Sequence, residues 1–190
     1  MITRVRDTKE TQIEVKLEIY GRGRSKIDTG VGFFDHMLDA FARHSLIDLE
    51  VKCKGDLHID AHHSVEDVGI VLGEAISEAI YPVKGLERFG SGVAVMDESA
   101  IECHIDLSNR PFLVYEVPID GKVGDFDVEL AEEFFRALSF NARFTMHLIF
   151  QRGKNRHHIL EASFKALALA FRRAISPNSR VDIPSTKGVL

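Results

Sequence analysis

Two short segments of the chain pair histidines with a glutamate at the same spacing. The segments are His62-His63-Ser64-Val65-Glu66 and His157-His158-Ile159-Leu160-Glu161. When such a segment begins a helix, each histidine lies about one turn from the glutamate, so the three side chains can share a face. Adjacent histidines point about 100° apart on a helix, and this divergence suits two different ions better than one. The pattern therefore predicts a two-metal site.

The ligand types favour a catalytic metal. Imidazole nitrogen with carboxylate oxygen suits manganese, iron or zinc, and neither segment has a nearby cysteine that would add a preference for thiolate. Mixed His and Glu sites with open positions are typical of catalytic ions, whereas structural zinc sites are usually rich in cysteine. The alternative interpretation is that these are surface or helix-capping histidines. Two copies of the motif, each after a polar loop, favour metal binding.

The elements that would position these segments are expected to occur twice in the same order. Each half should run strands, helix, strand, polar loop, His-His-x-x-Glu and helix. The predicted helices span 33–44, 62–80, 127–141 and 158–175, and the predicted strands span 11–19, 46–51, 92–97, 100–107, 112–117 and 144–150.

The spacing of the motifs indicates an internal duplication. The two His-His-x-x-Glu segments are offset by 95 residues, and on the helix before each of them His36 corresponds to Glu133 with an offset of 97 residues. We therefore predict an α+β fold of two similar halves of the split β-α-β type, with helices packed on sheets. The whole chain would be one catalytic domain, with quasi-repeats at about 1–90 and 91–176 and a C-terminal tail at 177–190.

Composition narrows the classes of partner. The chain has 190 residues, a net charge of −5 and 45% hydrophobic residues, with acids and bases interspersed. This balance argues against nucleic-acid binding, which needs a concentrated basic face. No apolar signal region or membrane-length apolar run is present, so we expect a cytoplasmic protein with no membrane partner. Cys53 and Cys103 are expected to be buried thiols.

Several basic and hydroxyl side chains could bind an anion. Arg88 and Arg110 lie in polar turns, where a guanidinium can reach a phosphate with bidentate geometry. Ser185 and Lys187 in the tail could add further donors, and Lys165 follows the second motif's glutamate by four residues. Taken alone, each of them reads as a solvated polar group.

Five segments of the chain resemble the signature sequences of the imidazoleglycerol-phosphate dehydratases. These segments are 33–39, 60–67, 109–111, 154–162 and 183–190. The similarity covers essentially the whole chain, and its length is that of the monofunctional form. The resemblance implies a lyase of histidine biosynthesis that converts D-erythro-imidazoleglycerol phosphate into imidazole acetol phosphate and water. It also implies two manganese ions per active site and a homo-oligomer of 24 subunits with active sites between subunits.

The resemblance also implies a role for each matching residue. The metal ligands would be His36, His62, His63, Glu66, Glu133, His157, His158 and Glu161. The substrate and its phosphate would be bound by Glu10, His44, Arg88, Arg110, Lys165, Ser185 and Lys187. Glu10, Glu66 and Glu161 would be the catalytic carboxylates. Two positions depart from the family pattern, since Glu133 replaces a histidine and Ala40 replaces a common glutamine.

The chemistry of the implied reaction explains why metals would be needed. A proton must leave a carbon beside an imidazole ring without a carbonyl to stabilise the charge. A metal on a ring nitrogen would lower the ring's pKa, so that an imidazolate could form and expel the neighbouring hydroxyl. Glu10 is the predicted acid/base. The alternative functions are a two-metal phosphate-ester hydrolase and a non-enzymatic metal-binding shell protein.

Overall fold

The two halves of the chain form the same series of elements. The structure is a computed structural model that describes residues 1–190. The first half contains β1 (Ile2–Asp7), β2 (Thr11–Glu18), β3 (Ser25–Asp28), α1 (Gly32–Ser45), β4 (Asp48–Gly55) and α2 (His62–Ile80). The second half contains β5 (Phe89–Met96), β6 (Ser99–Asp106), β7 (Phe112–Glu116), a small hairpin of β8 (Lys122–Val123) and β9 (Phe126–Asp127), α3 (Glu129–Ala142), β10 (Thr145–Arg152) and α4 (Arg156–Ala174).

Each half folds into a four-stranded sheet with a helix pair. The strand orders are β1-β2-β4-β3 and β5-β6-β10-β7. In each sheet one pair is parallel, β3 with β4 and β7 with β10, and the other pairs are antiparallel. Identical strand order and direction in both sheets confirm the predicted α+β fold of duplicated halves.

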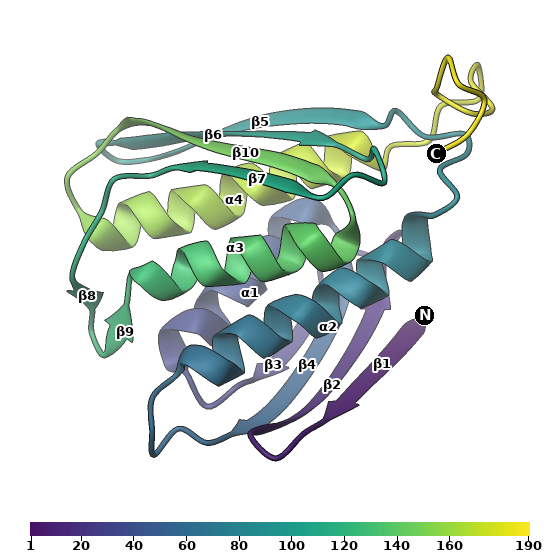
Figure 1. The fold of residues 1–190 in the computed structure, drawn as a ribbon. Coiled ribbons are helices and arrows are strands. Elements are labelled where there is room, and N and C mark those ends of the chain that lie inside the picture. The colour runs from purple at the N-terminus through teal and green to yellow at the C-terminus, as the bar shows by residue number, and fades with distance from the viewer.

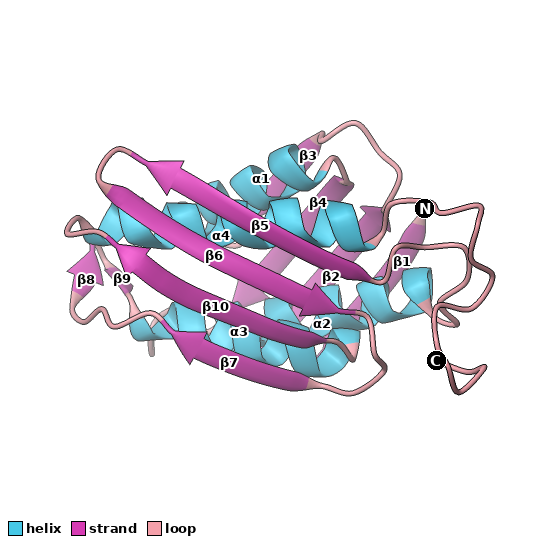
Figure 2. Ribbon diagram, turned by 90° about the horizontal axis from the view of Figure 1, so that it is seen from above, coloured by secondary structure: helices cyan, strands magenta, loops and turns pink.

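The two sheets enclose two layers of helices (Figure 1). The view from above shows the second sheet lying across the helices, with the first sheet beyond them (Figure 2). Helix α2 of the first half packs against α3 of the second, and α1 of the first half packs against α4 of the second. Both of these helix contacts therefore join the two halves. None of the four helices combines the length and apolar character needed to cross a membrane.

The core between the layers is continuous and rich in phenylalanine. The rings of Phe134 and Phe164 stack with centroids 5.3 Å apart, and Phe34 meets Phe134 edge-on at 5.2 Å. Such ring contacts stabilise the fold beyond what burial of the rings alone contributes. Because these three residues come from α3, α4 and α1, the core fixes the helices of one half against those of the other. Cys103 is fully buried in this core, but Cys53 is only partly buried, so the expectation of two buried thiols is confirmed for Cys103 alone.

Glycines allow two helices to approach their neighbours closely. A Cβ atom on Gly73 of α2 would stand 2.8 Å from the carbonyl oxygen of Leu138 on α3. A Cβ atom on Gly92 of β5 would stand 2.6 Å from the carbonyl oxygen of Ala166 on α4. Neither position has room for a larger side chain, so these contacts set how deeply α2 and α4 sit between the sheets.

Candidate metal centre

The first histidine of the second motif lies in a cluster of three potential metal ligands. His36 on α1 and His157 on α4 each point a ring Nε2 atom at the same carboxylate oxygen of Glu161, at 3.3 and 3.0 Å. The potential ligand atoms of the three residues all lie within 4.8 Å of one another. Two imidazoles and one carboxylate form a donor set that suits a divalent transition metal. The residues present therefore fit the predicted ion.

Glu161 is the least exposed member of this cluster. Its side chain is 8% exposed, and its other carboxylate oxygen accepts a hydrogen bond from Lys165 Nζ at 2.7 Å. Burial alone would raise the pKa of Glu161, but the hydrogen bonds from Lys165 and His157 outweigh burial and lower the pKa. His44 lies nearby on α1, where burial and then the charge of Lys165 lower the pKa of His44. The carboxylate is thus held ionised, the form that binds a metal.

The first motif is arranged more openly. His62 Nε2 lies 3.5 Å from Glu66 Oε2, and both side chains are about two-fifths exposed. The duplication places Glu133 of α3 opposite this pair, as His36 of α1 stands opposite Glu161. Helix contacts agree, because a Cβ on Gly69, one turn after Glu66, would stand 3.0 Å from the carbonyl oxygen of the residue that follows Glu133. Glu133 is half-buried there, but the ligand atoms of this set do not converge as closely as those around Glu161.

The second histidine of each motif turns away from the first. The rings of His62 and His63 are inclined by 87°, and those of His157 and His158 by 80°. His63 Nδ1 donates to Asp56 at 2.9 Å, while His158 Nδ1 donates to Glu98 at 2.8 Å. These hydrogen bonds raise the pKa of both histidines. A carboxylate on Nδ1 also fixes the tautomer and leaves Nε2 as the ring atom that could bind a metal.

Sequence reasoning missed the carboxylates of Asp56 and Glu98. Glu98 lies in the turn between β5 and β6, and Glu10 lies in the equivalent turn between β1 and β2. Glu98 is thus the counterpart of Glu10 in the second half, and the internal duplication could have identified it from the sequence. Glu10 itself is 57% exposed and stands 4.0 Å from His63 Nδ1. No sequence signal distinguishes Asp56 from the other acids of its polar loop.

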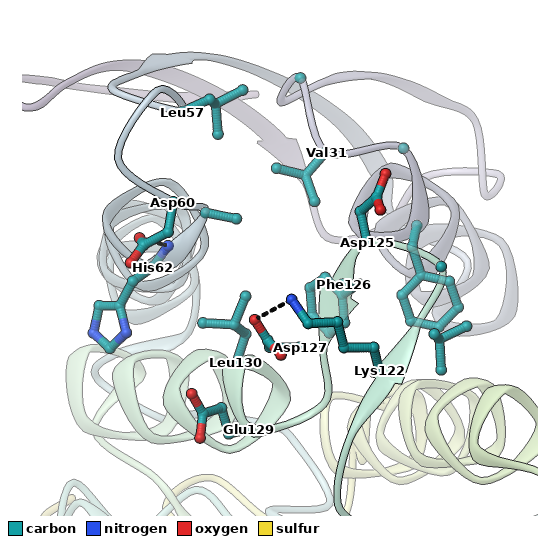
Figure 3. Close-up of a pocket in the computed structure, with 16 residues that line it drawn as sticks. Val31, Leu57, Asp60, His62, Lys122, Asp125, Phe126, Asp127, Glu129 and Leu130 are labelled. Atoms are coloured by element: carbon teal, nitrogen blue, oxygen red, sulfur yellow. Dashed lines mark hydrogen bonds and ion pairs between the residues drawn. The ribbon is translucent and has the colours of Figure 1, made fainter.

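A cavity adjoins the first motif at the end of the molecule where the helices begin. Its volume is about 670 Å³, and it is lined by residues of the α1, α2 and α3 starts and of the β8–β9 hairpin. His62 lies on the α2 side of the cavity, opposite Phe126 and Val31 (Figure 3). Phe33, which also lines it, packs edge-on against the ring of His157 at 5.2 Å. Phe33 therefore links the wall of the cavity to the second motif.

The predicted phosphate-binding residues do not all lie at this end. Lys165 is one turn from Glu161, but Arg88, Arg110 and the tail gather at the opposite end of the molecule. The peptide N–H of Arg88 donates to the carbonyl of Ala174, the last residue of α4, whereas His157 is near the first. Along a helix of 1.5 Å rise per residue this separation is about 25 Å. The structure thus places the predicted metal ligands at one end and most of the predicted phosphate ligands at the other.

Ala40 and the tail complete the placement of the predicted residues. Ala40 is buried in α1, where it is 6% exposed. Ser185 is half-buried and Lys187 is exposed, with the Lys187 N–H donating to Ser185 Oγ at 3.2 Å.

Comparisons with known proteins agree on one family. A family model described as imidazoleglycerol-phosphate dehydratase matches residues 29–171. Curated imidazoleglycerol-phosphate dehydratases from a Sulfurovum species and Sulfurimonas denitrificans are 67% and 66% identical over 190 residues, covering 100% of each chain. The dehydratase structure from Staphylococcus aureus has a TM-score of 0.83 at 38% identity and covers 94% of this chain and 100% of its own. The dehydratase structure from Pyrococcus furiosus has a TM-score of 0.86 at 39% identity, covering 98% and 100%. The chain belongs to the imidazoleglycerol-phosphate dehydratase family.

Proposed function

We propose that the chain dehydrates imidazoleglycerol phosphate on two manganese ions held by its His-His-x-x-Glu segments. Membership of the family assigns the reaction, a hydro-lyase step of histidine biosynthesis. The observation that carries the metal assignment is the convergence of His36, His157 and Glu161 within 4.8 Å of one another. The donor set equally suits iron or zinc. When bound, a divalent ion on the imidazole of the substrate would lower the ring's pKa. We place the enzyme in the cytoplasm.

The divergence of each histidine pair supports two separate ions. His157 faces Glu161, while His158 faces Glu98 on a different element. A single ion bound by one pair would need both rings to turn toward it, against the hydrogen bond that holds His158. We propose that the first histidine of each motif serves one ion with its own glutamate, and that the second serves another. Glu133 would complete the set of His62 and Glu66, where its charge replaces a neutral imidazole.

Glu10 is proposed to carry the proton between the substrate carbon and solvent. It lies in an exposed turn 4.0 Å from His63 Nδ1, so it can reach a substrate bound beside that histidine. Replacing Glu10 with glutamine should lower kcat by about 10²- to 10⁴-fold, the usual contribution of a general acid/base, with little change in KM. Glu14→Gln, on the adjacent strand, is the control and should leave both constants near wild type. A normal kcat for Glu10→Gln would remove Glu10 from this role.

The separation of metal and phosphate ligands supports active sites shared between copies of the chain. About 25 Å along α4 separates His157 from the end that contacts Arg88. One small substrate cannot bridge that distance, so a single chain cannot offer both groups to it. We propose that one copy provides the metal ligands and Lys165, and that another provides Arg88, Arg110 and the tail. A closed homo-oligomer, of 24 subunits as the resemblance implies, would supply such pairs.

The proposed function is tested by turnover of metal-stripped and reloaded protein. Purified protein stripped with a chelator should be inactive, and manganese should restore conversion of imidazoleglycerol phosphate to imidazole acetol phosphate. Bound metal is quantified in the same samples, and about two ions per chain are expected if the eight ligands form two sites. Release of inorganic phosphate would instead indicate the hydrolase. Metal uptake without product would indicate the shell protein, and either result would overturn the proposal.

A further inference from the structure

We infer that Asp106 is the positioning residue of the phosphate-binding end, where its carboxylate holds both arginines and, through one of them, the C-terminal tail. The inference rests on the proposed function, because it assumes that Arg110 and the tail bind the substrate's phosphate. Asp106 is the last residue of β6, and its side chain is 21% exposed.

Asp106 occupies the guanidinium fork of Arg88. Arg88 Nε donates to Oδ1 at 2.7 Å and Nη2 donates to Oδ2 at 3.2 Å. This bidentate geometry gives the strongest and most directional of the common ion pairs. The Arg88 side chain is 13% exposed, so solvent screens the pair little. The Nε and Nη2 donors of Arg88, which could otherwise bind a phosphate, are therefore already bound to a carboxylate of the same chain.

The remaining side of Arg88 holds the tail. Its Nη1 donates to the carbonyl of Pro184 at 2.6 Å. Ser185 follows directly and Lys187 lies two residues further, so this hydrogen bond sets where the two tail donors stand. Backbone contacts bring the tail to the same place, since the Gly85 N–H donates to the Asp182 carbonyl at 2.7 Å and Leu86 bridges to Pro177. Figure 1 shows the tail beside the start of β5 and the end of α4.

The backbone of Arg88 is strained into the conformation that aims its side chain. Its φ is 70°, which non-glycine residues adopt rarely. Its N–H donates to Ala174 O at 2.9 Å, and its carbonyl accepts from the Leu107 N–H at 3.1 Å. Such strain persists where the surrounding contacts hold the backbone in place, and it is commonest at functional sites. The second of these hydrogen bonds ties Arg88 to the residue after Asp106, so the two partners of the ion pair are also fixed through the backbone.

Arg110 shares the same carboxylate but remains available. Its Nη2 atom lies 3.6 Å from Asp106 Oδ2, and its side chain is 62% exposed. It can therefore keep a loose attraction to Asp106 while its fork reaches an incoming phosphate. Two cations beside one anion leave a net positive site, which an anionic ligand would favour. Arg88 then acts as the anchor of the tail, and Arg110 with the tail residues makes the direct phosphate contacts.

The inference is tested by the kinetics of Asp106→Asn. The amide presents an NH₂ group to a guanidinium and removes the charge that holds the fork, so the tail anchor should loosen. We expect KM for imidazoleglycerol phosphate to rise about 10-fold or more, as loss of a charge-assisted pair implies, with kcat within about twofold of wild type. Asp106→Glu, which keeps the charge, should recover part of the affinity. Trypsin should cut the tail at Lys187 faster in Asp106→Asn than in wild type.

Matched variants separate this inference from the proposed function. Glu78→Gln removes the carboxylate partner of Arg4, 2.6 Å away in wild type, an ion pair that includes neither Arg88 nor Arg110, and should leave KM unchanged. If Asp106→Asn does not fold, Arg88→Lys takes its place, since it keeps the charge but loses the fork and should raise KM similarly. Unchanged KM and tail cleavage, or an equal loss of kcat, would overturn the positioning role. If Arg110→Ala also left KM unchanged, the phosphate assignment itself would fail.

Discussion

Replacing Glu161 with glutamine should abolish manganese binding at the His36–His157 centre and reduce turnover to below about one thousandth of wild type. Losing an orienting partner alone costs a metal site about 10- to 100-fold in affinity, and loss of a direct ligand should cost at least that. The carboxamide also places an NH₂ donor against His36 Nε2 and His157 Nε2, which now lie 3.3 and 3.0 Å from carboxylate oxygen. Those lone pairs would then be occupied by hydrogen bonds.

The measurement is metal content and kcat after dialysis against limiting manganese. Glu132→Gln is the matched control, because Glu132 lies on α3 and pairs only with Arg136 on the surface. It should keep both full metal content and normal kcat. Circular dichroism of metal-free Glu161→Gln checks that the helices remain. Full occupancy of the metal sites together with wild-type turnover would show that Glu161 is not a ligand.

The repeated elements were predictable because each carries its own periodicity. Strand β2 alternates inward Ile13, Val15 and Leu17 with more exposed residues, and this pattern needs no knowledge of its neighbours. Strands β1 and β3 were not predicted for the opposite reason. Both are edge strands, and β1 is mostly exposed with only Ile2 and Arg6 half-buried. Their conformation comes from pairing with β2 and β4, which a local pattern does not record.

Helix α4 begins two residues before the predicted start, and the reason is a cap. The Asn155 side chain accepts hydrogen bonds from the N–H groups of His157 and His158 at 2.9 and 3.3 Å. Asparagine is a favoured N-cap because its side-chain oxygen satisfies amides that have no partner within the helix. The sequence reading placed Asn155 in a loop and so missed this signal. The cap matters for the site, since it fixes the turn that carries both histidines.

The sequence predicts which residues could be ligands, but it does not predict how they are arranged in space. Spacing alone places a histidine and a glutamate on one helix face, and the structure agrees for His157 and Glu161. Spacing does not reveal that Glu161 is buried while the side chain of Glu66 is about two-fifths exposed, because burial depends on which helix packs opposite. It likewise does not reveal the distance between Arg88 and the predicted metal ligands, which follows from the direction of α4 in the fold.

Mixed oligomers should recover activity that neither parent has, if the sites are shared between copies. Glu161→Gln removes a proposed metal ligand, and Arg110→Ala removes a proposed phosphate ligand, so each homogeneous oligomer should be nearly inactive. When the two chains are co-expressed in equal amounts with different tags, random assembly pairs an intact metal half with an intact phosphate half. This happens in about one quarter of the sites of a closed symmetric oligomer. Activity should therefore return to about one quarter of wild type, measured on doubly tagged oligomers.

A second mixture of chains distinguishes sites shared between copies from sites contained within one chain. One chain carries both Glu161→Gln and Arg110→Ala, and it is co-expressed with an equal amount of wild-type chain. Sites shared between copies should again retain about one quarter of wild-type activity, because both contributing chains must be wild type at the position each supplies. Sites contained within one chain would instead retain about one half in this mixture and almost nothing in the first. The ratio of the two mixtures thus decides whether the roughly 25 Å between His157 and Arg88 is bridged by a second subunit.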